Sequence, residues 1–81
     1  MAIQVIAAVY GTTSEGNDVT ERVQNRLDQG NDDVVVSNEK MGGDPQPFGL
    51  KRFGILYRVN GGRKRARAGV EGDRIELVEP S

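Results

Sequence analysis

Alternation of apolar and polar residues predicts strands over much of the chain. In residues 51–59 every second residue is large and apolar, which is the period of a strand with one buried face. These residues are Phe53, Ile55, Tyr57 and Val59. Residues 63–70 alternate in the same way between small apolar residues and cations. The segments 3–10, 32–37 and 74–79 are rich in β-branched residues and predict three further strands.

A period of four residues predicts one helix at 19–29. Val19, Val23 and Leu27 line a narrow apolar stripe on such a helix. Asp18 is suited to the N-cap, where its carboxylate accepts a backbone N–H. Gly30 is suited to the left-handed residue that commonly ends a helix.

Together these elements predict a single α+β domain over residues 1–81. We expect a mainly antiparallel β-sheet of four to five strands with one helix packed on a face, and a small β-sandwich with a short helix is the alternative. The stretch 38–49 holds three Gly and two Pro, which predicts a long loop. Either parity of the first strand can face inward. The expected core, besides the helix stripe, is Ile3 or Val5, Val9, Val35, Phe53, Ile55, Tyr57, Ala66, Val70, Ile75 and Leu77.

Asn-Gly-Gly at residues 60–62 predicts a tight hairpin turn. A two-residue turn pairs Tyr57 with Lys64 or with Ala66, depending on which two residues form it. A three-residue turn would pair Tyr57 with Arg65 and bury a cation, which is costly. We therefore expect a two-residue turn.

Either two-residue turn gathers arginines on the solvent side of the hairpin. The predicted face comprises Arg58, Arg63, Arg65 and Arg67, with Arg52 farther along. Arginine presents a fixed fork of donors that suits carboxylates and phosphates, so this face is the candidate binding site. The alternatives are a solvated face whose charges prevent edge-to-edge pairing, or a face neutralised by acidic residues of the same fold.

The composition excludes the commonest catalytic chemistry. The chain has no cysteine and no histidine, and therefore no disulfide, thiolate or imidazole. The remaining candidate carboxylates lack the spacing of a calcium loop or of a catalytic pair. They are Glu15, Asp18, Asp32, Asp33 and Asp44. We expect no enzymatic activity, no metal and no cofactor.

The net charge of −1 hides an asymmetry between the two halves of the chain. Residues 1–44 hold eight acids and three bases, a balance of −5, and residues 45–81 hold four acids and eight bases, a balance of +4. A chain of this kind can bind a foreign surface or pair with a copy of itself. An isoelectric point near 5.3 and only two Tyr and two Phe do not favour nucleic acid.

We therefore expect a non-enzymatic module that binds an acidic protein surface or a small anion through the arginine face. The expected partner is another protein or a second copy. Nucleic-acid binding by the same ribbon and a self-assembling structural unit are the alternatives. The longest apolar run, VIAAVY, is too short to cross a bilayer, so we expect no membrane association and a cytoplasmic location.

The segments VYG, DVTERV, MGGDPQPFGLKRFGILYRVNGG and EGDRIEL together resemble a small domain of unknown function. That domain occurs at the C-terminus of a mitochondrial J-domain (DnaJ-like) protein and in free-standing or appended microbial copies. The matching positions are Tyr10, Gly11, Asp18, Val19, Thr20, Gly43, Asp44, Pro45, Lys51 and Tyr57. The resemblance implies a compact auxiliary module, without known catalysis, that is attached to or partners other proteins. The run of arginines departs from the family pattern.

Overall fold

The computed structural model describes residues 3–12, 15–37 and 51–78. In chain order the elements are β1 (Ile3–Gly11), β2 (Gly16–Asp18), α1 (Thr20–Asp28), β3 (Asp33–Val35), β4 (Arg52–Val59), β5 (Arg65–Val70) and β6 (Arg74–Glu76). An antiparallel sheet has the order β2-β1-β4-β5, and β3 pairs with β6 in a separate two-stranded ribbon. The predicted α+β class is confirmed. The predicted loop at 38–49, with Asp44, lies outside the described residues.

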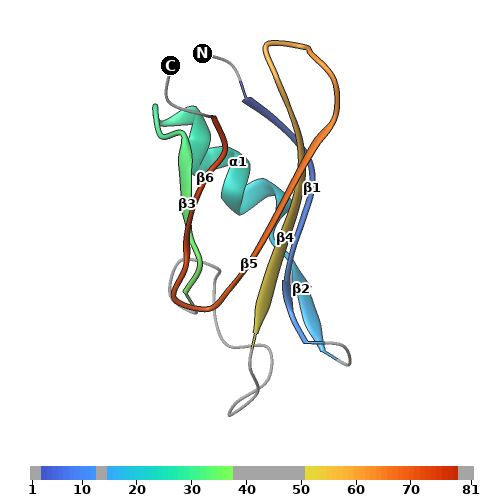
Figure 1. Ribbon diagram of the computed structural model, residues 1–81, viewed down its shortest axis with the longest axis vertical. Helices are drawn as coiled ribbons and strands as arrows, with labels where there is room; N and C mark the ends of the chain where they lie inside the picture. The colour runs from blue at the N-terminus through green and yellow to red at the C-terminus, as the bar shows by residue number, and fades with distance from the viewer. Residues whose placement is uncertain (1–2, 13–14, 38–50, 79–81) are drawn as a thin grey trace.

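The fold is layered, and the described residues cover one side of the four-stranded sheet and not the other. Figure 1 shows α1 between this sheet and the β3–β6 ribbon, so both lie on the same side of it. We call this side the inner side. The hydrophobic core lies on this inner side, and the largest fully buried side chains of the core include Tyr10, Tyr57, Phe53 and Leu77. The Tyr57 hydroxyl donates a 2.6 Å hydrogen bond to the Leu77 carbonyl, which links β4 to the end of the ribbon.

β1 faces the core with both parities, because a β-bulge divides it. Val5 pairs with Tyr57 and Ala7 pairs with Leu56, so Ile6 is an extra residue in the ladder. Val5 is buried before the bulge, and Ala8 is buried after it. An extra residue reverses which side chains point inward, so neither choice of parity holds for the whole strand.

Side chains of α1 complete the hydrogen bonding along one edge of β1. β2 pairs only with the last three residues of that strand. Farther back, Gln24 Oε1 accepts the Val5 N–H at 2.7 Å and Gln24 Nε2 donates to the Ile3 carbonyl at 2.9 Å. The Thr20 hydroxyl accepts the Ala8 N–H at 3.0 Å. The helix therefore occupies an edge that would otherwise present unpaired backbone groups.

The C-terminal end of α1 follows its predicted signal, but the N-cap is Val19 and not Asp18 as predicted. The helix begins one residue later and ends one residue earlier than the sequence predicts. Asp18 Oδ1 accepts the Thr20 backbone N–H at 3.0 Å and the Thr20 hydroxyl at 2.6 Å. Gly30 has a φ of 96° and donates its N–H to the Leu27 carbonyl, as expected for the residue that stops the helix.

The hairpin between β4 and β5 has the predicted turn but not the predicted register. Asn60 and Gly61 both have positive φ, and the Gly62 N–H donates to the Val59 carbonyl at 2.9 Å, which defines a two-residue primed turn. The ladder nevertheless pairs Tyr57 with Arg65. Three residue steps separate Gly62 from Arg65, whereas two separate Val59 from Tyr57. One extra residue on the β5 side therefore shifts the register, and the predicted pairing is wrong.

Gly69 gives a physical reason for this register. It lies opposite Phe53, and a Cβ built on it would be 2.8 Å from Ile75 Cδ1 in β6. The two expected registers would have placed Ala68 or Val70 at this position. In the observed register Gly69, which has no side chain, lies where β6 of the ribbon packs against β5 of the sheet.

The bulge and the register together account for the errors in the predicted core. Phe53, Ile55, Tyr57, Ile75 and Leu77 are buried as predicted, and so is the helix stripe. Four residues predicted to be in the core are not buried, and these are Val9, Val35, Ala66 and Val70. Val9 is turned outward by the bulge, and Ala66 and Val70 are turned outward by the register. Val34 and Val36, the neighbours of Val35, are buried in its place.

Gly69→Ala is expected to destabilise the protein by ~1–3 kcal/mol, because the new methyl group overpacks the contact with Ile75. Gly54→Ala is the matched control on the neighbouring strand. A Cβ at Gly54 would meet only a Val9 methyl at 3.8 Å, so no loss of stability is expected. Urea unfolding of both variants measures the difference, and equal stabilities would contradict the assigned register.

Gln24→Ala is expected to lower stability by ~1–2 kcal/mol, because it removes the bonds to the Val5 N–H and the Ile3 carbonyl. Asn25→Ala changes the adjacent, exposed helix position and is expected to be neutral. Amide hydrogen exchange should show faster exchange at Val5 in the Gln24 variant only. Unchanged protection there would refute the role of Gln24 at the strand edge.

Candidate interaction surface

The structure divides the predicted arginine face between the two sides of the sheet. Arg52 and Arg58 lie on the outer side of β4, since they alternate with its buried residues. Arg65 and Arg67 lie opposite core residues of β4 and therefore share the inner side. Arg63 is exposed in the connection between the strands. The prediction that these five residues form one outer face is wrong.

The position of β5 at the edge of the sheet explains how its cations tolerate the inner side. α1 packs against β1, at the other end of the layer from β5. Arg65 is half-buried and Arg67 is exposed, so neither side chain is enclosed in the core. The cost of burying a cation, which led us to expect a different register, applies to a central strand and not to β5 at the edge of the sheet.

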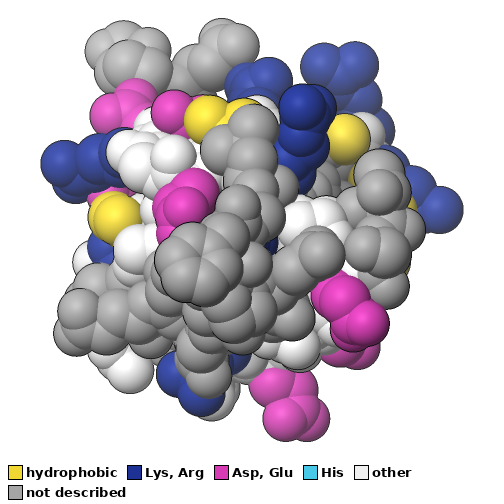
Figure 2. All heavy atoms as spheres, turned by 90° about the horizontal axis from the view of Figure 1, so that it is seen from below, with side chains coloured by type: hydrophobic (Ala, Val, Ile, Leu, Met, Phe, Trp, Pro, Cys, Tyr) yellow, Lys and Arg dark blue, Asp and Glu magenta, His cyan; other side chains and the backbone are white. Residues whose placement is uncertain are grey.

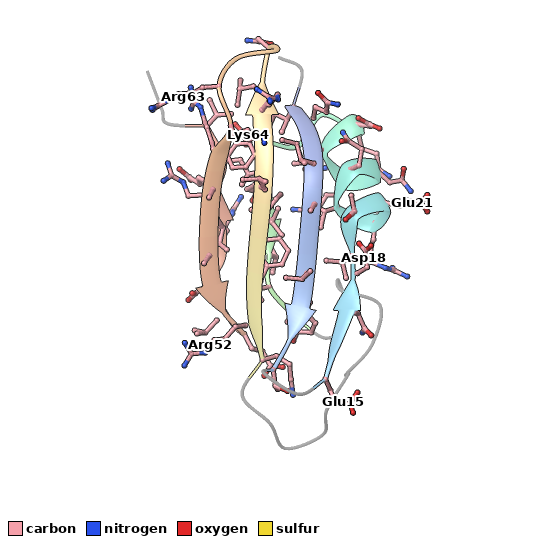
Figure 3. The ribbon with its side chains drawn as sticks, turned by 90° about the vertical axis from the view of Figure 1, so that its right-hand side faces the viewer. Glu15, Asp18, Glu21, Arg52, Arg63 and Lys64 are labelled. Atoms are coloured by element: carbon pink, nitrogen blue, oxygen red, sulfur yellow. The ribbon has the colours of Figure 1, made fainter. Side chains whose placement is uncertain are left out.

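The outer side of the sheet is lined by small and medium apolar residues. Ladder pairs join them in two rows across β1, β4 and β5, namely Ala7, Leu56 and Ala66, then Val9, Gly54 and Ala68. With Val70 these residues form a surface that we call the apolar strip. Val9 is 56% exposed and Val70 is 36% exposed. No described element lies over the strip (Figure 3).

Charges of opposite sign flank the apolar strip. On the side of β4 and β5, Arg63 and Lys64 lie at the hairpin end and Arg52 at the opposite end, and we call these three cations the basic edge (Figure 3). The acidic edge, beside β2 and the first turn of α1, comprises Glu15, Asp18 and Glu21 (Figure 3). Figure 2, seen along the strands, shows Lys and Arg side chains in the upper part of its right-hand margin and Asp and Glu side chains in the lower part. The outer side is therefore apolar in the middle and dipolar across its width.

An open groove of ≈ 1040 Å³ runs beside α1 next to the acidic edge. Its polar lining includes Asp18, Glu21 and Arg26, and its apolar lining includes Ile6 and Val34. The Thr20 hydroxyl hydrogen bond holds the pKa of Asp18 below its ordinary value. Asp18 is hydrogen-bonded at the start of the helix and Arg26 is paired with Asp33, so these two groups stabilise the fold at the groove.

Asp33 is a buried carboxylate with two arginine partners. Arg26 Nη2 lies 3.2 Å from Asp33 Oδ1, and Arg74 Nε donates to Asp33 Oδ2. Burial acts to raise the pKa of Asp33, but the hydrogen bond and charge of Arg74 and the charge of Arg26 outweigh it and hold the pKa below its ordinary value. These contacts join α1, β3 and β6. No spacing in the sequence indicated them.

Lys51 is buried at the start of β4. Its Nζ lies 3.9 Å from Glu71 Oε1, which also accepts a 3.3 Å hydrogen bond from the Tyr10 hydroxyl. Lys51 is 3% exposed, so its ammonium needs this partner. This cluster connects β1, β4 and the turn after β5, which indicates a structural role at one end of the sheet.

Within the described ranges, no three Asp or Glu side chains come close enough to hold a metal ion. No helix in the same part of the chain is long and apolar enough to cross a membrane. Comparisons with protein-family models, curated proteins and solved structures found no match. The resemblance to the domain that accompanies a J domain stays a prediction.

Asp33→Asn is expected to lower stability by ~2 kcal/mol at neutral pH, because it leaves Arg26 and Arg74 without their carboxylate. The folded pKa of Asp33 is depressed, so its contribution is fully present above the unfolded pKa of about 3.9 and is lost as pH falls through the folded value. The difference from wild type should therefore shrink as the pH drops below about 4.

Urea unfolding at a series of pH values measures this difference. Asp32→Asn is the matched control, because Asp32 is the adjacent residue and is exposed. The same pH dependence in both variants would show that the effect is one of overall charge and not of the Asp33 ion pairs.

Proposed function

We propose that this chain is a non-enzymatic interaction module that docks a protein partner on the outer side of its four-stranded sheet. The apolar strip supplies the centre of the docking surface, and the basic edge faces acidic groups on the partner. The observation that carries the proposal is the exposure of the strip, including Val9 and Val70, with cations beside it at both ends of the sheet.

The residues of the strip suit contact with another polypeptide. Ala, Gly and Val side chains are short, so the backbone of a partner strand or helix can approach closely. A protein interface typically combines an apolar centre with a polar rim, and the strip and its charged edges have this arrangement. Of the five arginines predicted as a site, Arg52, Arg58 and Arg63 remain candidates on or beside this surface, while Arg65 and Arg67 lie on the inner side.

A small anion is a weaker candidate for the same surface. An anion site needs donors that converge on one point. Here Arg58 Nη1 already donates a 2.8 Å hydrogen bond to the Gly62 carbonyl, and Arg52 and Arg63 lie at opposite ends of the sheet. An extended acidic surface can contact separated cations, whereas a single anion cannot. On the grounds of its sequence we keep the cytoplasm as the proposed location.

The proposal is tested by following alanine methyl signals in NMR during titration with a peptide of alternating Leu and Glu. Ala7, Ala66 and Ala68 lie on the outer side and are expected to shift, whereas the buried Ala8 serves as an internal reference and is expected not to. A peptide with Lys in place of Glu is expected to bind at least ~10-fold more weakly, which corresponds to about 1.4 kcal/mol.

Ala68→Glu is expected to weaken peptide binding by a similar factor, because it places a carboxylate in the apolar strip. Arg65→Glu changes the same strand on the inner side and is the matched control. Thermal unfolding confirms that both variants fold. Equal weakening by the two changes, or saturable binding of duplex DNA without binding of the peptide, would contradict the proposal.

A further inference from the structure

We infer that the partner of this surface is a second copy of the chain, packed face to face about a two-fold axis parallel to the strands. The inference rests on the proposed function, since it uses the same docking surface. It adds the identity of the partner and its orientation. Two properties of the surface lead to it, the opposite charge of its edges and its exposed apolar centre.

The charge layout selects the symmetry axis. A two-fold axis in the interface and parallel to the strands exchanges left and right across the sheet. The acidic edge of one copy then lies over the basic edge of the other, at both ends of the interface. An axis perpendicular to the strands would instead place acid over acid and base over base. Unlike charges attract in only the first arrangement, so the surface is complementary to itself.

At one end of the sheet the charges also match along the strands. Gly11 pairs with both Gly16 and Arg52, so Glu15, which precedes Gly16, lies near the height of Arg52. Figure 3 shows Glu15 and Arg52 at the same end of the sheet and on opposite edges. An axis parallel to the strands keeps each residue at its height. It therefore brings Glu15 of one copy toward Arg52 of the other.

The size of the face is enough for a weak dimer. Strand spacing near 4.8 Å and a rise near 3.3 Å per residue give about 400 Å² on each copy for the 9, 3, 8 and 6 residues of β1, β2, β4 and β5. The total of about 800 Å² lies below the standard size of specific interfaces and in the range of weak, transient ones. Small side chains allow two sheets to pack at about 10 Å with nearly aligned strands. We therefore expect dissociation in the micromolar range or above.

Association through the edges of the sheet is opposed by the rest of the fold. The edge of β1 is occupied by Gln24 and Thr20, and β2 is only three residues long. Two β5 strands paired in antiparallel fashion would bring Arg65 and Arg67 of one copy close to those of the other, and like charges across a ladder are destabilising. The outer face is therefore the favoured route to self-association.

Sedimentation equilibrium over a concentration series at low salt tests the inference. The wild type is expected to approach twice the monomer mass at high concentration and to dissociate as salt is added. Arg52→Glu/Lys64→Glu makes both edges acidic, and Glu15→Lys/Glu21→Lys makes both edges basic. Each double variant alone is expected to associate at least ~10-fold more weakly than wild type. Arg65→Glu, on the inner side, is expected to associate like wild type.

The decisive sample is an equal mixture of the two double variants. In the proposed geometry each edge in the mixed dimer again faces an edge of opposite net charge, so association is expected to return to the wild-type level. A mixture that stays monomeric while wild type dimerises would overturn the two-fold arrangement. Thermal unfolding checks that each variant is folded.

The outcome is separable from that of the proposed function. If the wild type stays monomeric at every concentration but still binds the acidic peptide, the self-pairing is overturned and the docking surface stands. If the wild type dimerises and the mixture recovers, both stand. If there is neither dimerisation nor peptide binding, both fall.

Discussion

The hydrogen-bonding capacity of β1 is the constraint on which the rest of this fold depends. β4 satisfies one side of the strand, but β2 is too short to satisfy the other. Gln24 and Thr20 of α1 supply the missing partners, which fixes the helix along this edge and on the inner side of the sheet. With α1 held there, the described part of the chain has no second helix to cover the outer side. Because α1 is held at the edge of β1, the described residues leave the outer side of the sheet uncovered.

The C-terminal part of the chain closes the inner side by a different set of contacts. Tyr57 bonds to the Leu77 carbonyl, and Asp33 holds α1, β3 and β6 together through Arg26 and Arg74. A domain of this size buries only about 60% of its unfolded surface, so its core is thin. Buried polar contacts at the boundaries of that core specify where the ribbon lies. Gly69 permits the close approach, and this in turn fixes the register of β5.

That register decides the character of the outer side. Had β5 paired as expected, the outer side would carry a row of arginines, and the apolar residues of β5 would be in the core. The extra residue before Arg65 places the arginines of β5 on the inner side and its apolar residues on the outer side. It turns Ala66 and Ala68 outward beside Leu56 and Gly54, and it leaves the strip with cations on one flank and carboxylates on the other. This arrangement is the basis for proposing a protein partner in place of the polyanion that the run of arginines suggests.

The sequence by itself determined the elements that depend on neighbouring residues. The helix stripe, the stop at Gly30, a two-residue primed turn within residues 60–62 and the inward parity of β4 all follow from local periodicity or backbone preference. Three features were decided only by tertiary structure, namely the bulge at Ile6, the register of β5 and the ion pairs of Asp33. Each depends on contacts between residues that are far apart in the sequence, such as the packing of Ile75 against Gly69. A single extra residue in a ladder reverses the two faces of a strand, and no alternation pattern records where that residue falls.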